Sequence, residues 1–166
     1  MSESLADSPA NVVALAGLLV EATAHGASVG FLHPLDPAKA AVFWRHSLAE
    51  GAAGRRIVLG ARDGAVLVGT VTVVLAAPEN QRHRADVQKL LVAVSHRRRG
   101  IGRRLMAEAE ARAARAGRSL LVLDTATDAA ARLYERTGWN LTGAIPGYAL
   151  LPNGAPCATS IYWKNV

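Results

Sequence analysis

Hydrophobic and polar residues follow two different periods along the chain, and these periods separate helical stretches from strands. In the first fifty residues, apolar side chains recur every three or four positions, which is typical of helices that bury one face. Both stretches begin with a capping residue followed by proline, Ser8-Pro9 and Asp36-Pro37, and this pair is a helix-start signal. We therefore expect two helices, the first ending near Gly26 and the second near Gly51. Residues Met1–Asp7 are expected to form a flexible tail.

Three strand-like stretches follow. Arg56–Arg62 and Ala65–Ala76 are rich in apolar and β-branched residues, and the Asp63-Gly64 pair between them favours a tight hairpin turn. Ala85–Val94 has a similar character. We expect three strands, the first two joined as a hairpin.

The second half of the chain alternates between helices and strands. From Ile101 onward, apolar residues occupy one helical face, and Gly117 is a typical left-handed cap for the end of such a helix. Leu120–Leu123 is a short continuous apolar run, as expected for a strand that is buried on both faces. A further helix is expected over Asp128–Thr137.

Two final strand-like stretches, Trp139–Ala149 and Ala158–Trp163, predict a hairpin around Pro152-Asn153-Gly154. The predicted order of elements is ααβββαβαββ, which indicates an α/β fold with a mixed sheet. Because the Ala85–Val94 strand, the next helix and the following apolar strand form a βαβ unit, the two strands are expected to be parallel. We expect a single domain that spans residues 1–166.

The composition excludes intrinsic disorder and a membrane-spanning helix. Hydrophobic residues make up 51% of the 166 residues and charged residues 19%, so the chain can bury a core. The longest nearly apolar run, Val12–Val20, has nine residues, whereas a spanning helix needs about 20. No secretory signal is visible at the N-terminus, and a single cysteine, Cys157, excludes an internal disulfide. We expect a soluble cytoplasmic protein without a membrane partner.

The positive charge is concentrated in one segment. The whole chain carries +6, but Arg82–Arg118 contains 11 basic residues against three acidic ones. This excess predicts an anionic partner, either nucleic acid or a small phosphate-bearing ligand, although a solvated helix face would also explain it. Because the sequence has no helix-turn-helix, zinc-finger or RNA-binding aromatic motif, we expect no nucleic acid.

A short glycine-containing segment, Gly100-Ile101-Gly102, lies between a predicted strand and a predicted helix. Glycine lets the backbone turn tightly and approach a ligand closely, and the first N–H groups of a helix have no intrahelical partner. Together these features predict a cradle for a pyrophosphate, with arginines on both sides of it. The segment matches neither the Walker A motif nor the Rossmann fingerprint. The alternative is a basic helix cap without a ligand.

Two motifs resemble those of a known superfamily. Val94-x-x-Arg97-x-x-Gly100-x-Gly102 is similar to motif A of the GNAT superfamily of acetyl-CoA-dependent N-acetyltransferases, and Leu133-Tyr134-Glu135-Arg136-x-Gly138-Trp139 is similar to its motif B. The resemblance implies the GNAT-like fold, a mixed central sheet of about seven strands flanked by about four helices. Within it, His25–Phe31, Ala85–Leu90 and Pro146-Gly147-Tyr148 resemble the tabtoxin-resistance acetyltransferases of plant-pathogenic bacteria.

The resemblance implies acetyl-CoA as cosubstrate and assigns the residues that hold it. The strand before the loop is expected to bind the pantetheine arm through its main chain, and the loop amides are expected to bind the pyrophosphate. Position 127 is Thr where the family usually has Asn, so the contact there falls to Thr127 or Asp128. The expected cofactor-binding residues are Leu91, Val92, Val94, Arg97, Arg98, Arg99, Gly100, Ile101, Gly102, Arg103, Thr127, Asp128 and Tyr134.

Acetyl transfer to an amine requires a neutral amine, a donor to the developing oxyanion and a proton for the leaving thiolate. Tyr134 matches the family's usual general acid; the alternative for it is packing between helix and sheet. The resemblance implies that a main-chain N–H near Val92 is the oxyanion donor. Asp86 and Asp124 are assigned jointly to binding and deprotonating the amine. Alternation along the strand places Asp86 on the face of Gln88 and Leu90. The alternative for Asp86 is a charge that faces solvent, and the alternative for Asp124 is a cap of the turn before the next helix.

The resemblance implies direct attack in a ternary complex on an amine acceptor. Similarity to a toxin-resistance enzyme favours a small amino-acid-like amine, such as a toxin or an antibiotic, and the alternatives are a peptide N-terminus, a polyamine and a metabolic amine. Substrate-binding residues are expected to be Ser28, Phe31, Asp86, Asp124 and Tyr148. The five histidines show no metal-ligand spacing, so no metal is expected. Homodimers are common in this superfamily, so a homodimer is one expected state. Two functions are alternatives to an acetyltransferase. One is a nucleic-acid-binding domain that uses the basic residues of Arg97–Arg118, and the other is a CoA-binding sensor without catalytic activity.

Overall fold

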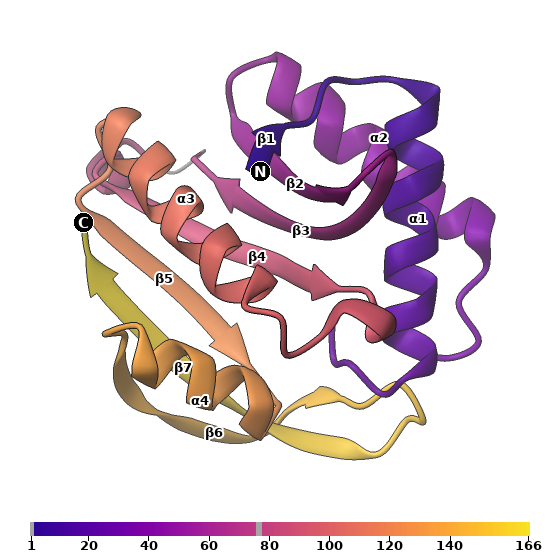
Figure 1. Ribbon diagram of the computed structural model, residues 1–166. Helices are drawn as coiled ribbons and strands as arrows, with labels where there is room; N and C mark the ends of the chain where they lie inside the picture. Colours follow the sequence, from indigo (N-terminus) through magenta and orange to yellow (C-terminus); the bar gives the residue numbers. More distant parts are fainter. Residues whose placement is uncertain (1, 76–77) are drawn as a thin grey trace.

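A computed structural model describes residues 2–75 and 78–166. Its framework is a seven-stranded mixed sheet in the order β1-β2-β3-β4-β5-β7-β6 (Figure 1). Of the strand pairs in this sheet, β4 and β5 form the parallel one, as the predicted βαβ unit required, and the others are antiparallel. The strands are Ser2–Ser4 (β1), Arg56–Asp63 (β2), Val66–Val74 (β3), Arg84–Val92 (β4), Leu120–Thr125 (β5), Asn140–Leu150 (β6) and Pro156–Asn165 (β7).

Four α-helices accompany the sheet within the described residues, and the two capping signals start the first two of them. The side chain of Ser8 accepts from the Asn11 N–H at 3.3 Å, and Asp36 accepts from the Ala38 N–H at 2.8 Å. Each satisfies a main-chain donor that the helix itself leaves unpaired. The helices are Pro9–Ala24 (α1), Pro37–Ala52 (α2), Ile101–Arg115 (α3) and Asp128–Arg136 (α4), with 3₁₀ turns at Glu79–Gln81 and Val94–His96.

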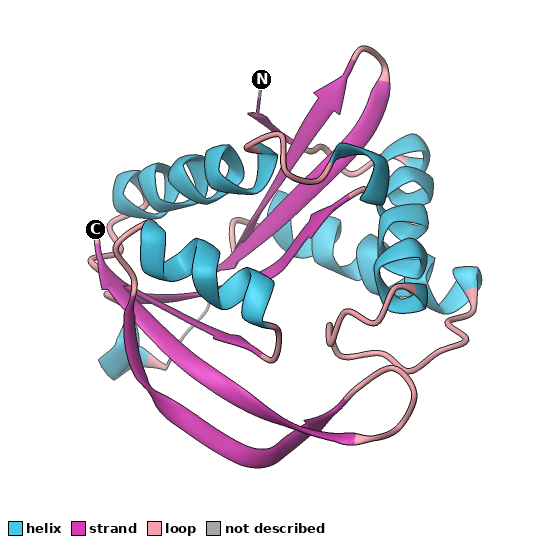
Figure 2. Cartoon of the chain, turned by 60° about the horizontal axis from the view of Figure 1, so that its bottom comes forward, coloured by secondary structure: helices cyan, strands magenta, loops and turns pink. Residues whose placement is uncertain are grey.

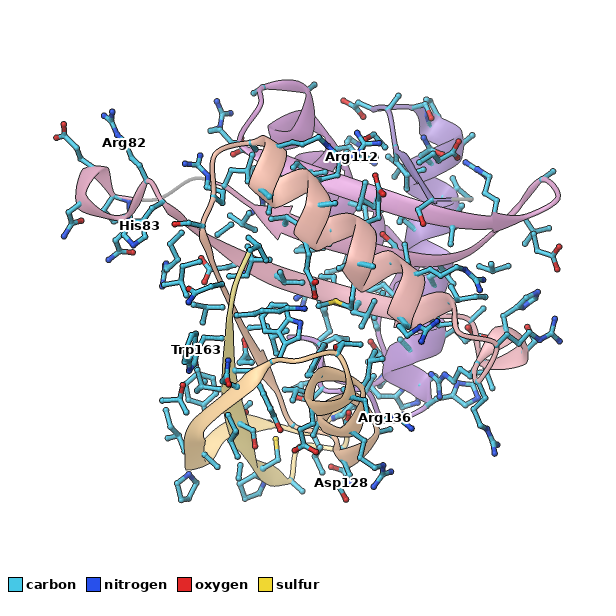
Figure 3. All side chains as sticks on the ribbon, turned by 60° about the vertical axis from the view of Figure 1, so that its left-hand side comes forward. Arg82, His83, Arg112, Asp128, Arg136 and Trp163 are labelled. Carbon is cyan, nitrogen blue, oxygen red and sulfur yellow. The ribbon has the colours of Figure 1, made fainter. Side chains whose placement is uncertain are left out.

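The helices divide between the two faces of the sheet, and each face has its own core. Helices α3 and α4 cover one face, where Leu105, Leu121 and Tyr162 are buried together. Helices α1 and α2 cover the other, where Leu19 and Trp44 are buried. Figure 2 shows the two helix pairs on opposite sides of the sheet, and in Figure 3 the labelled side chains of α3 and α4 belong to the same layer. Fully burying one such apolar side chain contributes about 1.5–3 kcal/mol.

The N-terminal segment differs from the expected tail. Ser2–Ser4 pairs with β2, the Leu5 N–H donates to the Val58 carbonyl at 2.9 Å, and the Leu5 side chain is only 9% exposed. The prediction of a flexible tail is therefore wrong for these residues, because a free sheet edge offers hydrogen bonds to any adjacent extended segment. Met1, and Ala76 at the predicted end of the second strand, lie outside the described residues.

The parallel pair β4–β5 is short. Its register joins only Arg84–Asp86 to Leu120–Val122, after which the two strands diverge (Figure 1). On its other side, β4 stays paired to β3 as far as Val92. The part of β4 beyond Asp86 therefore has a partner on one edge and none on the edge that faces β5, and we call this divergence the fork.

Candidate active site

The free edge of β4 exposes main-chain hydrogen-bonding groups in the fork. The Ala93 N–H donates to the Val68 carbonyl of β3 at 2.9 Å. Because successive N–H groups of a strand point to opposite edges, the Val92 N–H faces the fork. The Val92 carbonyl, on the same edge, accepts from Arg97 Nε at 3.2 Å. The fork thus presents a main-chain donor at the position where the sequence predicts the oxyanion donor.

A β-bulge in β4 changes which side chains face the fork. Thr70 pairs with Leu91 and Thr72 with Gln88, so β4 contains one residue more than β3 between these pairs. Lys89 absorbs the difference with a φ of +54°. A bulge of this kind reverses the side-chain alternation beyond it.

This reversal corrects one prediction. Ala85 and Val87 before the bulge, and Leu90 and Val92 after it, all pack with the core under α3 and α4. The sequence alternation places Asp86 on the same face as Leu90, and that placement is wrong.

The loop between β4 and α3 has the geometry of an anion cradle. Gly100 is the N-cap of α3 with a φ of +75°, and Arg98 has a φ of +60°. A non-glycine residue in this conformation is uncommon and is often found at functional sites. At Gly102 a Cβ would lie 3.4 Å from Leu133 of α4, so the start of α3 packs closely on α4. The loop therefore offers unpaired helix N–H groups beside Gly100, which has no side chain to obstruct a ligand.

The arginines of this loop fall into two groups. The side chains of Arg97 and Arg104 hydrogen-bond to the main-chain carbonyls of Val92 and Arg99, at 3.2 Å and 3.3 Å. The side chains of Arg98, Arg99 and Arg103 are exposed and have no carboxylate within 4.0 Å in the described part of the chain. Their charges are available to an anion.

Tyr134 lies in α4 and is only 6% exposed. Its ring packs against Trp139 and Tyr162, with centroid distances of 5.9 Å and 5.8 Å. Burial raises the pKa of the Tyr134 hydroxyl well above its usual value, and the negative charge of Asp124 raises it further. The phenol therefore stays protonated at neutral pH, as a proton donor must.

The two predicted carboxylates occupy different places. Asp124 is exposed and lies two residues beyond Val122, where β5 has left β4. Asp86 lies at the closed end of the fork, opposite Val122, and accepts from the guanidinium of Arg84 at 3.3 Å. Both carboxylates lie on the face of the sheet opposite α3. Asp124 is the one whose negative charge raises the pKa of Tyr134.

The predicted acceptor residues come from segments that meet near the fork. Ser28 Oγ, in the loop between α1 and α2, donates to the Leu150 carbonyl of β6 at 3.4 Å. The His33 N–H donates to the Pro152 carbonyl in the hairpin between β6 and β7 at 2.9 Å. Figure 2 shows this loop and this hairpin side by side. Phe31 is half-buried against Phe43, with a centroid distance of 5.5 Å.

The remaining predicted residues, Tyr148, Thr127 and Asp128, lie at the edge of the site. Tyr148 on β6 is 56% exposed. Thr127 is the half-buried N-cap of α4, and Asp128 is exposed at the first position of that helix (Figure 3). Both are adjacent to the end of β5.

Sequence reasoning missed Lys89. Its Nζ lies 5.3 Å from the centroid of the Phe43 ring, on the face that carries Asp124. Burial lowers the pKa of this ammonium, with repulsion from Arg56 acting in the same direction and attraction to Asp124 opposing both. The available signal was a charge at an apolar position, because strict alternation places Lys89 on the same face as Ala85 and Val87.

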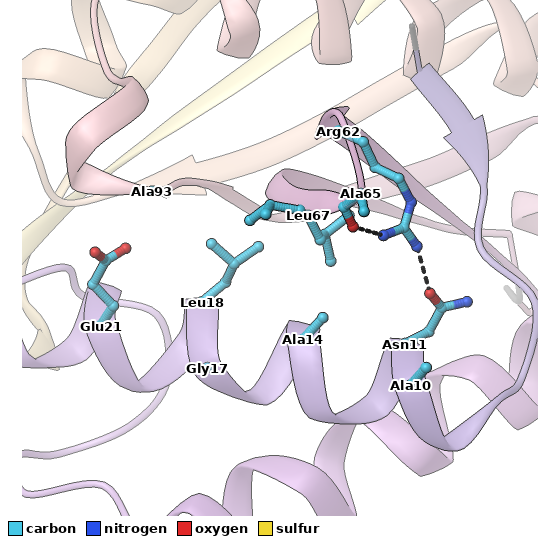
Figure 4. A pocket seen from close by; sticks show the side chains of 11 residues that line it. Ala10, Asn11, Ala14, Gly17, Leu18, Glu21, Arg62, Ala65, Leu67 and Ala93 are labelled. Atoms are coloured by element: carbon cyan, nitrogen blue, oxygen red, sulfur yellow. Dashed lines mark hydrogen bonds between the residues drawn. The ribbon is translucent and has the colours of Figure 1, made fainter.

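A separate cavity of about 530 Å³ lies between α1 and the β2–β3 hairpin (Figure 4). Small residues of α1, Ala10, Ala14 and Gly17, form one wall. Arg62 crosses its end and donates to Asn11 Oδ1 at 2.8 Å and to the Ala65 carbonyl at 3.1 Å. Of the segment Leu91–Val94 that is expected to bind the pantetheine arm, Ala93 lines this cavity, and the other predicted site residues do not.

Within residues 2–75 and 78–166, no three His, Cys, Asp or Glu side chains are arranged to hold a metal ion. In the same residues, no helix has both the length and the apolar character needed to cross a membrane.

The fold and the site together define a class. A mixed sheet that forks between two parallel strands, with a glycine and arginine loop at a helix start and a buried tyrosine nearby, is the framework of a CoA-dependent N-acyltransferase. The model of the Acetyltransferase (GNAT) family matches residues 20–139. The chain belongs to this family and is an acetyl-CoA-dependent N-acetyltransferase.

Solved structures of other proteins share this fold. A ribosomal-protein-alanine N-acetyltransferase from Brucella melitensis has a TM-score of 0.82 and 20% identity, over 100% of this chain and 99% of that one. A phosphinothricin acetyltransferase from Sinorhizobium meliloti, solved in complex with acetyl-CoA, has a TM-score of 0.81 and 16% identity, over 100% and 88% of the two chains. An N-acetyltransferase from Staphylococcus aureus Mu50 has a TM-score of 0.82 and 12% identity, over 99% and 97%.

Proposed function

We propose that this protein transfers the acetyl group of acetyl-CoA to the primary amine of a small amino-acid-like acceptor, by direct attack in a ternary complex. The observation that carries the proposal is the fork itself. It places an unpaired strand edge, the carboxylate of Asp124 and the protonated phenol of Tyr134 around the divergence of β4 and β5.

The residues around the fork and its loop fit acetyl-CoA. The φ of +75° at Gly100 and its missing side chain leave the first N–H groups of α3 accessible to a pyrophosphate, while Gly102 lets α3 pack on Leu133 of α4. The exposed side chains of Arg98, Arg99 and Arg103 supply positive charge. The pantetheine arm is proposed to bind along the main chain of Leu91–Val94, where, among the described residues, the Val92 N–H is unpaired and the Val94 N–H donates to Glu21 at 3.2 Å. Thr127 or Asp128 adds a contact beside the end of β5. When bound, acetyl-CoA supplies the activated acyl group.

Each step of the chemistry then falls to a residue of this chain. Asp124, with Asp86 further back on the same face, attracts the acceptor ammonium and takes up its proton through water. The Val92 N–H donates to the carbonyl oxygen that gains negative charge during transfer. The Tyr134 hydroxyl gives its proton to the departing sulfur and regains one from the acceptor nitrogen, which loses its second proton as the amide forms.

The acceptor is proposed from the surroundings of the fork. The loop between α1 and α2 is hydrogen-bonded to the β6–β7 hairpin through Ser28 and His33. This closure beside Phe31 and Tyr148 favours a small amine over a protein chain. The Sinorhizobium meliloti neighbour is a phosphinothricin acetyltransferase, and the sequence resembles tabtoxin-resistance enzymes, so a toxin or antibiotic amine is the acceptor that we favour. We also propose that the enzyme acts in the cytoplasm, with a homodimer as one assembly state.

A CoA-release assay tests the proposal. The protein is mixed with acetyl-CoA and with pools of amino acids, amino-acid-like antibiotics, polyamines and peptides, and the product is identified by mass spectrometry. We expect acetylation in the pools that contain small amino-acid-like amines. Acetylation of peptides alone would contradict the proposed acceptor, and calorimetric binding of duplex DNA in preference to acetyl-CoA would contradict the enzyme assignment.

A further inference from the structure

Lys89 stands at the centre of the bulge in β4 and reaches across to α2. Its ammonium lies 5.3 Å from the centroid of the Phe43 ring, within the range of a cation–π contact. A Cβ built on Gly30, in the loop between α1 and α2, would lie 3.6 Å from the same nitrogen. The Lys89 ammonium is therefore held beneath the loop that borders the proposed acceptor site.

This ammonium lacks an anionic partner. Throughout residues 2–75 and 78–166, no carboxylate lies within 4.0 Å of it, and it makes no hydrogen bond to the protein. By contrast, Lys164 donates to Glu110 at 2.8 Å and to the Thr137 carbonyl at 2.7 Å. A partly buried charge without a partner is unfavourable, and burial lowers the pKa of Lys89 accordingly. An anion bound here would relieve that cost.

The backbone at this position does not explain the choice of lysine. A φ of +54° is adopted most easily by glycine or asparagine, and a long side chain gains nothing from it. A strained lysine whose charge is unpaired, beside a reaction site, is better explained by a ligand than by packing.

The charges on this face are arranged as a complementary pair. Asp124 lies at the end of β5 and its negative charge acts on both Lys89 and Tyr134. Of the other cations nearby, Arg84 is paired with Asp86, whereas Arg56 hydrogen-bonds to the neutral Ser47 Oγ at 3.3 Å and keeps its charge. Within the described residues, the negative charge of Asp124 and the unpaired positive charge of Lys89 therefore face the same region, with Arg56 adding to the positive side.

We propose that Lys89 binds an anionic group of the acceptor, a carboxylate in the simplest case, while Asp124 binds its ammonium. This inference rests on the proposed function and narrows it to amines that carry an anion close to the amino group, such as α-amino acids. Polyamines and amines without an anionic group fit this arrangement poorly, because they leave Lys89 unpaired and repel it.

Matched pairs of acceptors test the inference. Each amino acid that the enzyme acetylates is compared, as a substrate, with the carboxamide of the same amino acid. The carboxamide keeps the free amine and lacks the negative charge of the carboxylate. For the unmodified enzyme we expect kcat/KM to be at least tenfold higher for the carboxylate form. In Lys89→Met this preference should disappear, through a higher KM for the carboxylate form and little change for the carboxamide, and Lys89→Arg should restore part of it.

Lys39 provides the matched control. Its ammonium lies over the Phe31 ring at 5.9 Å on the exposed side of α2, so Lys39→Met removes a similar cation without reaching the fork. We expect it to keep the preference. An equal loss of preference in Lys39→Met would overturn the inference in favour of long-range attraction, and an equal fall in kcat for both acceptor forms in Lys89→Met would overturn it in favour of a role in the chemistry.

Binding is measured separately by calorimetry with the amino acid and its carboxamide in the presence of CoA. The inference would be overturned if the unmodified protein bound the two forms equally well. It would also be overturned if the tighter binding of the carboxylate form were lost in Lys89→Arg as completely as in Lys89→Met. If no amine of any kind is acetylated, the proposed function fails, whereas the calorimetric comparison still decides whether Lys89 binds an anion. Circular dichroism of each variant shows whether it has folded.

Discussion

The Tyr134 phenol retains its proton because its surroundings disfavour the charged form. The ring lies between Trp139 and Tyr162, and Asp124 places a negative charge nearby. Both effects oppose the formation of a tyrosinate, so the residue can donate a proton and cannot serve as a base near neutral pH. The acceptor amine must therefore lose its proton to a different group. Asp124, whose charge raises the pKa of Tyr134, is the carboxylate that we propose for this role.

Tyr134→Phe removes the hydroxyl and keeps the ring. If the phenol protonates the leaving sulfur, kcat should fall about 10²-fold or more, the range for a general acid, while calorimetry should show nearly unchanged acetyl-CoA binding. Tyr162→Phe is the matched control, because its hydroxyl donates to Glu135 at 3.1 Å and has no proposed role in transfer. Undiminished kcat in Tyr134→Phe would assign that tyrosine to packing and would favour a CoA-binding sensor.

Asp124→Asn and Asp86→Asn separate the two carboxylates. Asp124→Asn should raise the acceptor KM at least about tenfold, equivalent to about 1.4 kcal/mol of binding, and should move the pH optimum to higher pH, because a neutral amide cannot take up the ammonium proton. Asp86→Asn should have a smaller effect on KM and cost up to about 1 kcal/mol of stability, since it breaks the half-exposed pair with Arg84. Steady-state kinetics and urea unfolding measure these effects, and unchanged acceptor kinetics in both variants would place the amine site elsewhere.

Strand β4 and helix α3 form the element on which the site is built. One edge of β4 is paired to β3 between Asp86 and Val92, with a bulge at Lys89, and the other edge is free beyond Asp86. The strand then leads directly into a helix whose first N–H groups are unpaired and whose N-cap is a glycine with positive φ. A single strand–loop–helix unit therefore presents both a free main-chain edge and an anion cradle.

Gly100→Val tests the cradle. A branched Cβ at a φ of +75° strains the loop and obstructs the approach of a pyrophosphate, so acetyl-CoA affinity should fall more than tenfold, a loss above about 1.4 kcal/mol. Gly117→Val is the matched control, because Gly117 has the same φ of +75° beyond the other end of α3 with open space around it. It should lower stability without lowering affinity. Wild-type affinity of Gly100→Val in calorimetry would contradict the cradle.

The charge of the whole molecule is uneven. The chain carries +6, and its excess of basic residues lies in Arg82–Arg118. Part of this charge is neutralised within α3, where Glu108 pairs with Arg112 at 2.6 Å and with Arg115 at 3.3 Å. What remains unpaired is concentrated in the loop before α3, which suits a ligand with several phosphate groups.

Salt should therefore weaken acetyl-CoA binding. Exposed charges are screened beyond about 8 Å at physiological ionic strength, so the dissociation constant measured by calorimetry should rise several-fold between dilute and molar NaCl. Replacing Arg98, Arg99 and Arg103 by Gln should flatten this dependence, and Arg115→Gln should leave it unchanged. A flat response in the unmodified protein would mean that the main-chain cradle carries the binding alone.

The sequence alone was sufficient for most of the framework. The caps at Ser8 and Asp36, the order of helices and strands and the parallel βαβ unit all depend on local signals, because capping, periodicity and crossover handedness act over short stretches of chain. The glycine loop and Tyr134 were visible for the same reason, as compact motifs with fixed spacing.

Only the tertiary structure decided the rest. Pairing of Ser2–Ser4 with β2 depends on a sheet edge that is far away in sequence. The bulge at Lys89 depends on the register against β3, and one extra residue reverses every side chain beyond it. The approach of Lys89 to Phe43 and the effect of Asp124 on Tyr134 follow from that register and from how the strands diverge. Local pattern determines which elements form, whereas the environment of a charge is set by whatever other segments pack around it.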